Sequence, residues 1–135
     1  MSNLCCEIDL PTIPLDDIND ELGRIALCTL SAINFGNIKI PQDFEKMCTL
    51  AVRGLDALLT YQNYPIKAAE LATKEFRPLG VGIINLAYFL ARKGLSYSDP
   101  KSLRVIDEYM EAWSYYLIKA SADLAVEQGP CERWK

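Results

Sequence analysis

The chain has 135 residues, half of them hydrophobic and about a quarter charged, so one globular unit is expected. Its net charge of −4 argues against binding to a nucleic-acid backbone, because no face rich in lysine and arginine is available. The longest apolar run, residues 79–91, is too short to cross a membrane, and no signal peptide is recognisable, so we expect a cytoplasmic protein.

The chain contains no histidine, which removes the commonest general base and metal ligand. Its cysteines are few and scattered: Cys5, Cys6, Cys28, Cys48 and Cys131. An odd, widely spaced set without a signal peptide is typical of reduced thiols. No Cys-x-x-Cys pair occurs, so the sequence predicts no metal site.

The first seven residues place an amide, a thiol and a carboxylate at alternating positions. In an extended backbone Asn3, Cys5 and Glu7 would share one face, because alternate side chains point the same way. An amide that orients a substrate, a sulfur that reacts and a carboxylate that moves a proton are the parts of a small active site. Taken alone, the same residues are more typical of an ordinary frayed terminus than of a catalytic site.

The first third of the chain predicts extended structure. Residues 1–14 contain Pro11 and Pro14, which exclude a continuous helix, and the acidic residues 16–21 indicate a solvated turn or short helix. Residues 25–34 are apolar and partly β-branched. They predict a buried strand that runs into a helix or turn closed by Gly36.

Helices are predicted over about residues 42–62 and, in a shorter piece, through residues 68–72. The first helix has an apolar face on which Cys48 is expected to be a core residue. That face comprises Phe44, Met47, Cys48, Ala51, Leu55, Leu58 and Leu59.

Two further helices are predicted in the second half of the chain. Residues 79–93 indicate one that is apolar nearly all round, with Gly94 as its left-handed cap. The longest is expected over residues 100–128, capped by Ser98 or Asp99 and ended by Gly129. Its apolar stripe indicates core packing in preference to a coiled coil, and comprises Leu103, Ile106, Met110, Trp113, Leu117, Ala120 and Leu124.

Five strings in the chain resemble, in order, the large catalytic subunit of class I ribonucleotide reductase. They are Ser-Asn-Leu-Cys-Cys-Glu-Ile at 2–8, Ile-Ala-Leu-Cys-Thr-Leu-Ser-Ala at 25–32, Leu-Asp-Ala-Leu-Leu at 55–59, Arg-Pro-Leu-Gly-Val-Gly-Ile-Ile-Asn-Leu-Ala-Tyr at 77–88 and Lys-Ala-Ser-Ala-Asp-Leu-Ala-Val-Glu-Gln-Gly-Pro-Cys at 119–131. The resemblance implies a mostly helical fold with short strands. Residues 1–135 would be a single fragment of a ten-stranded α/β barrel, containing the catalytic loop and its flanking helices.

The resemblance also implies roles for the residues of the first two strings. Cys5 would carry the thiyl radical that removes the 3′ hydrogen of the ribose. Glu7 would be the base on the 3′-hydroxyl, and Asn3 would hydrogen-bond the substrate. Cys28 would be half of the dithiol that supplies two electrons. Cys6 stands where the family commonly has an apolar residue, so we expect it to pack away from the substrate.

The implied partners are the remainder of the large subunit, a radical-generating small subunit that contains metal, and a ribonucleoside diphosphate. Electrons would come from a thioredoxin- or glutaredoxin-type reductant, and no cofactor, nucleic acid or membrane would bind the chain directly. The family's second redox cysteine and tyrosine relay have no match here, and Tyr115-Tyr116 lies outside any relay motif. The isolated chain is therefore expected to be inactive, as a split-gene product or a cut fragment.

Two alternatives compete with a reductase fragment. One is a non-catalytic helical module that binds related reductase chains. The other is a small thiol-redox protein that uses Cys5, Cys6 and Cys28. The first would lack activity even when assembled, whereas the second requires a stable disulfide within the chain itself.

Overall fold

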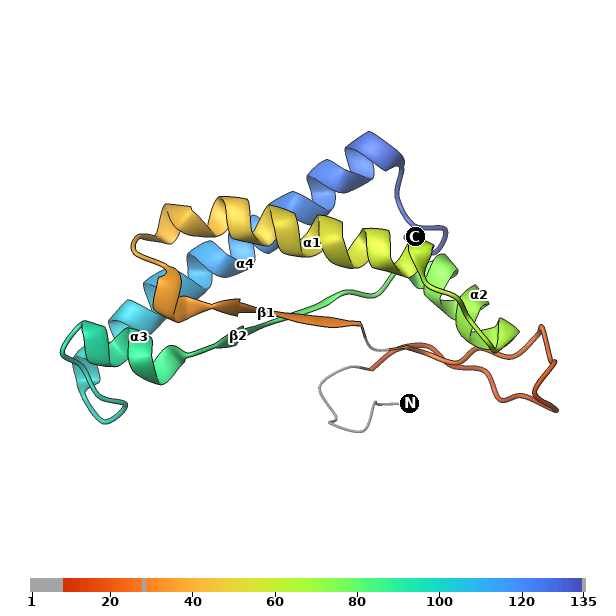
Figure 1. Ribbon diagram of the computed structural model, residues 1–135, viewed down its shortest axis with the longest axis horizontal. Coiled ribbons are helices and arrows are strands. Elements are labelled where there is room, and N and C mark those ends of the chain that lie inside the picture. Colours follow the sequence, from red (N-terminus) through yellow and green to blue (C-terminus); the bar gives the residue numbers. More distant parts are fainter. Residues whose placement is uncertain (1–8, 28, 135) are drawn as a thin grey trace.

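The computed structural model describes residues 9–27 and 29–134, and Figure 1 shows their arrangement. The fold is mostly helical with a short two-stranded sheet, as predicted. In chain order the elements are β1 (Leu30–Asn34), the 3-10 turns η1 (Phe35–Asn37) and η2 (Pro41–Asp43), α1 (Phe44–Tyr61), α2 (Lys67–Phe76), β2 (Gly80–Ile84), α3 (Leu86–Arg92) and α4 (Pro100–Gln128).

The two strands are parallel and in register from Leu30 opposite Gly80 to Asn34 opposite Ile84. Helices α1 and α4 pack against each other and run along the same side of the sheet (Figure 1). Ile33, which faces them, is only 3% exposed, whereas Leu30 on the other face is 57% exposed. Parallel sheets are normally covered on both faces, so a sheet covered on one face agrees with a part of a larger barrel.

The prediction of a single helix over residues 79–93 is wrong, because the chain forms β2 and then α3. Gly80 and Gly82 are poor helix formers, and the residues between and after them are β-branched. Asn85 then adopts the left-handed conformation with φ of 67°, which separates the strand from α3. A short apolar run cannot be assigned to helix or strand from periodicity alone.

The other predicted helices are confirmed. Helix α4 begins where Asp99 accepts a hydrogen bond from the Lys101 backbone at 2.9 Å, and its cap residue Gly129 has φ of 89°. Gly94, with φ of 68°, follows α3 as predicted. No helix in the described part of the chain is long and apolar enough to span a membrane.

The apolar faces of the helices are narrower than their sequence pattern indicated. In α1 the buried side chains are Phe44, Cys48, Val52, Leu55 and Leu59. Met47, Leu58 and, in α4, Leu103 are exposed, contrary to prediction. Helix α1 contacts α4 and β1 with one side, so apolar residues away from that side remain in solvent.

An aromatic cluster holds the carboxyl ends of both strands. Phe35 lies 5.0 Å from Phe44 and 5.6 Å from Phe89, and Phe89 lies 4.7 Å from Tyr109, all measured between ring centroids. Gly36 sits so close to the end of β2 that an added Cβ would meet Asn85 Nδ2 at 2.5 Å. Aromatic packing and this close approach fix the sheet at that end.

Candidate functional site

The four predicted site residues, Asn3, Cys5, Glu7 and Cys28, lie outside the described residues. What the structure does describe is the chain on both sides of position 28 and the elements that hold it. These contacts lie at the amino end of the sheet, the end opposite the aromatic cluster.

Before position 28, the chain is paired with the segment that precedes it. Ile13 and Arg24 form an antiparallel bridge with two N–O distances of 3.1 and 2.9 Å. Because the pair is antiparallel, the chain toward residue 7 and the chain toward residue 28 leave the bridge in the same direction. The backbone N–H of Ile25 then donates to the carbonyl of Ala68 in α2 at 3.3 Å.

After position 28, the chain is tied to the second strand at once. The carbonyl of Thr29 accepts a hydrogen bond from the N–H of Gly80 at 2.9 Å, and the β1–β2 pairing begins with the next residue. The backbone is therefore anchored to α2 three residues before position 28 and to β2 one residue after it.

Glu75 in α2 is the polar centre of this region. Its Oε1 accepts hydrogen bonds from Arg24 Nε at 3.1 Å and Arg24 Nη2 at 2.6 Å. Its Oε2 lies 3.6 Å from Arg133 Nε, and its carbonyl accepts from the Arg133 backbone at 3.1 Å. The hydrogen bond from Arg24 lowers the pKa of the Glu75 carboxyl, so this group stays ionised at neutral pH.

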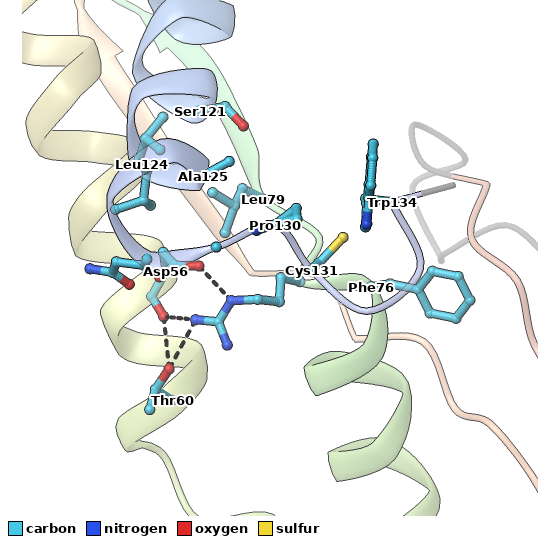
Figure 2. A pocket seen from close by; sticks show the side chains of 14 residues that line it. Asp56, Thr60, Phe76, Leu79, Ser121, Leu124, Ala125, Pro130, Cys131 and Trp134 are labelled. Atoms are coloured by element: carbon cyan, nitrogen blue, oxygen red, sulfur yellow. Dashed lines mark hydrogen bonds and ion pairs between the residues drawn. The ribbon is translucent and has the colours of Figure 1, made fainter.

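A second ion pair joins the end of α2 to α1. Arg77 adopts the left-handed conformation with φ of 45°, and its Nε donates to Asp56 Oδ1 at 2.6 Å. Its Nη2 reaches the Asp56 carbonyl at 2.7 Å and Thr60 Oγ1 at 2.9 Å, and Figure 2 shows the dashed lines that meet at Asp56 and Thr60. This pair fixes where α2 ends and where the chain turns toward β2.

The pair borders a cavity of about 420 Å³ between α1, the carboxyl end of α4 and the chain that follows α4 (Figure 2). Phe76, Leu79, Leu124, Cys131 and Trp134 also line it. Among the described residues that line it, the only carboxylate, Asp56, is ion-paired with Arg77, and the thiol of Cys131 has no other candidate base beside it. This arrangement supports the junction of three segments and offers no acid–base or nucleophilic chemistry.

Cys48 is confirmed as a core residue. It is fully buried in α1 with Sγ 3.8 Å from the carbonyl of Trp113, and burial raises its pKa to about 11. A thiol with so high a pKa is not a nucleophile at neutral pH. Within the described ranges, no group of three or more His, Cys, Asp or Glu side chains could hold a metal ion.

Sequence reasoning missed Arg24, Glu75 and Arg77. The ion pair between Arg24 and Glu75 joins residues 51 positions apart, so no local spacing marks it. For Arg77 the available signal was the following proline, which disfavours helix at the residue before it.

Comparison with known proteins identifies the family. The family described as "Ribonucleotide reductase, barrel domain" matches residues 1–135. The ribonucleoside-diphosphate reductase subunit alpha of Haemophilus influenzae is 55% identical over 131 residues, which is 97% of this chain and 17% of the relative. The ribonucleoside-diphosphate reductase 1 subunit alpha of Escherichia coli K12 is 55% identical over 130 residues, covering 96% of this chain and 17% of the relative.

The likeness extends beyond cellular bacterial enzymes. The subunit alpha of Enterobacteria phage T4 is 48% identical over 134 residues, covering 97% of this chain and 17% of that protein. The chain thus spans about 17% of the length of the curated relatives it matches. Since the family match covers every residue, the chain belongs to the ribonucleotide reductase barrel-domain family.

Proposed function

We propose that this chain supplies the radical-bearing loop and one redox cysteine of a ribonucleoside-diphosphate reductase large subunit. It would act only when assembled with the remainder of that subunit. The observation that carries the proposal is the family match over residues 1–135, which includes the string Asn3-Leu4-Cys5-Cys6-Glu7. Relatives with about half of their aligned residues identical are named as subunit alpha of this reductase.

The chemistry needs one group for each step. Cys5, as a thiyl radical, would take the 3′ hydrogen atom from the ribose, and Glu7 would accept the proton of the 3′-hydroxyl. The 2′-hydroxyl would take a proton from one thiol of the pair formed by Cys28 and a second cysteine outside this chain, and leave as water, while Asn3 holds the substrate in place. The pair would deliver its other hydrogen to C2′ and close to a disulfide, giving up two electrons in all. Glu7 would then return its proton to the 3′ oxygen and Cys5 its hydrogen atom to C3′, which restores the thiyl radical.

The described elements on either side of position 28 support this assignment. Leu30 and Ala32, which follow position 28 in β1, lie on the uncovered face of the sheet. Under the proposal this face is the interior of the ten-stranded barrel. The antiparallel bridge between Ile13 and Arg24 pairs the segment that follows the first string with the segment that leads to β1.

The open edges of the sheet support the remainder of the subunit as a partner, and the other proposed partners are carried over from the family resemblance. In the described part of the chain β1 and β2 form a two-stranded sheet, so each strand keeps one outer edge for strands of the remaining subunit. The radical would come from a metal-containing small subunit and the electrons from a thioredoxin- or glutaredoxin-type protein. The substrate would be a ribonucleoside diphosphate.

The test is reconstitution with a matched pair of cysteine variants. The chain is co-expressed with the flanking parts of a subunit alpha, the small subunit is added, and reduction of a ribonucleoside diphosphate is measured. Cys5→Ala is expected to abolish turnover, Glu7→Gln to lower it by about 10²- to 10⁴-fold, and the adjacent Cys6→Ala to retain it.

Three results would contradict the proposal. A folded wild-type assembly without reductase activity would favour the non-catalytic interaction module. Loss of activity in Cys6→Ala together with retention in Cys5→Ala would show that the resemblance assigns the wrong thiol. Peptide mapping of a stable disulfide within the isolated chain would instead favour the thiol-redox protein.

A further inference from the structure

The carboxylate of Glu75 joins three segments that are far apart in the sequence: its own helix α2, the chain before β1 and the chain after α4. We propose that Glu75 is a positioning residue for the chain that enters β1. By holding Arg24, it would fix the backbone at Arg24 and Ile25, which lead to β1. This inference rests on the proposed function only in giving position 28 a redox role.

The geometry at Glu75 is that of a fixed anchor. Both hydrogen bonds from Arg24 end on the same oxygen, and the side chains of Arg24 and Glu75 are only 16% and 12% exposed. The remaining nitrogen of the guanidinium, Nη1, donates to the carbonyls of Glu21, Leu22 and Gly23. One guanidinium therefore ties a whole turn to α2, which a single point charge could not do.

Backbone hydrogen bonds continue this attachment along the chain toward β1. Ile25, next to Arg24, donates to Ala68 in the first turn of α2, and Thr29 accepts from Gly80 at the start of β2. Helix α2 and strand β2 are in turn held by Arg77, which binds Asp56 in α1. Ile25 and Thr29 are thus each held by a hydrogen bond to a helix or strand, and Glu75 stabilises the contact at Ile25.

Glu70 provides a matched control on the same helix. It is also a glutamate with two basic partners, but these are Lys67 and Lys74, both within α2. In the described part of the chain both of its ion pairs stay within α2, so they stabilise the helix locally. Substituting Glu70 removes a similar charge without releasing the chain that precedes β1.

The experiment measures alkylation of each cysteine in the folded full chain by iodoacetamide. Trypsin places Cys28, Cys48 and Cys131 in different peptides. It cleaves before Cys28 at Arg24, and between the three cysteines at Lys39, Lys46, Arg53 and Lys119, among other sites. Glu75→Gln is expected to raise the rate at Cys28 by about three- to tenfold, as loss of an ion-paired anchor shifts a local opening equilibrium. Glu70→Gln should leave that rate within about twofold of wild type.

Buried Cys48 reports whether the effect is local, because its rate rises only when the core opens. Arg24→Lys keeps the tryptic cleavage site before Cys28 but loses the paired geometry of the guanidinium, so it should also raise the Cys28 rate. Combining it with Glu75→Gln should add little, since both changes weaken one contact. Equal Cys28 rates in Glu75→Gln and Glu70→Gln would overturn the inference. So would a parallel rise at Cys48, which would mean general loosening or failure to fold.

The outcome is separable from the proposed function, because alkylation requires no reductase activity. If the rates change as expected while the reconstituted assembly is inactive, Glu75 remains the anchor and only the redox role of position 28 is lost. If the assembly is active but the rates do not change, the reductase assignment stands and this positioning role does not.

Discussion

At the carboxyl end of the β1–β2 sheet the strands run into a cluster of aromatic rings, whereas at the amino end the chain is held by ion pairs from α2. Phe35 and Phe44 are fully buried in the first region. In the second, Arg24 and Glu75 retain partial exposure and a charge each. The stability of apolar packing depends little on pH and ionic strength, whereas ion pairs respond to both. The amino end of the sheet is therefore the end whose stability should change with pH and salt.

The largest effect is expected where the aromatic cluster is emptied. Phe44→Ala should lower the free energy of unfolding by about 3–5 kcal/mol, because it removes a fully buried ring that contacts Phe35 and Tyr109. Urea unfolding measures this loss, with Leu50→Ala on the exposed side of α1 as the control at about 0.5 kcal/mol or less. Equal losses in the two variants would mean that the cluster is not the core of the fold.

A pair of glycine-to-alanine substitutions tests the close approach of Gly36 to Asn85, with Gly54 as the control. Gly36→Ala should cost about 1–3 kcal/mol, because its Cβ would lie 2.5 Å from Asn85 Nδ2 and 2.8 Å from a ring carbon of Tyr88. Gly54→Ala, in the middle of α1 with nothing within 4 Å of the added carbon, should instead stabilise the chain by about 0.5–1 kcal/mol. Thermal unfolding of both variants gives the two signs, and a stabilising Gly36→Ala would contradict the described packing.

At the amino end, the junction between α2 and α1 should respond to geometry as well as charge. Arg77→Lys keeps the charge but cannot reach Asp56 Oδ1, the Asp56 carbonyl and Thr60 together, so a loss of about 1–2 kcal/mol is expected. Urea unfolding of Arg77→Lys and of Lys74→Arg, an exposed change on α2, makes the comparison. A neutral Arg77→Lys would show that charge alone holds the junction.

The smallest effect is a pH dependence. The pKa of Glu75 is lowered by its hydrogen bond with Arg24, below the ordinary value of 4.5. The stabilisation from this pair is therefore complete above that value and is lost as the pH falls through the folded-state pKa. The stability difference between wild type and Glu75→Gln should be constant near neutral pH and shrink on acidification. A difference that persists unchanged at low pH would exclude the ion pair as its cause.

The sequence predicted the helical parts of this comparison well and the strands less well. Helices α1 and α4 carry long periodic stripes and clear end signals such as Pro100 and Gly129, which require no tertiary information. Strand β2 was mistaken for helix because its apolar side chains lack a period. Its glycines and β-branched residues favour a strand, and its pairing with β1 decides the assignment. The exposure of Met47 and Leu58 depends on which side of α1 meets a neighbour, which only the assembled fold decides.

The candidate site, like the fold, could be predicted from the sequence only in part. Asn3, Cys5, Glu7 and Cys28 were identified from strings that resemble a family, and the family match is confirmed over the whole chain. Their roles remain predictions, because they lie outside the described residues. Glu75 and Arg24 could not be predicted, since a contact between distant residues leaves no periodic or motif signal.

The most direct test makes the same substitution, cysteine to serine, at position 28 near the amino end of the sheet and at position 48 in the core. In the reconstituted subunit, Cys28→Ser should abolish turnover supported by a dithiol reductant while unfolding near the wild-type temperature. Cys48→Ser should lower the unfolding temperature, because it places a hydroxyl in the buried core, and retain turnover wherever the assembly is folded. Retained turnover in Cys28→Ser, or its loss in a stably folded Cys48→Ser, would contradict the division between a reactive amino end and a structural carboxyl end.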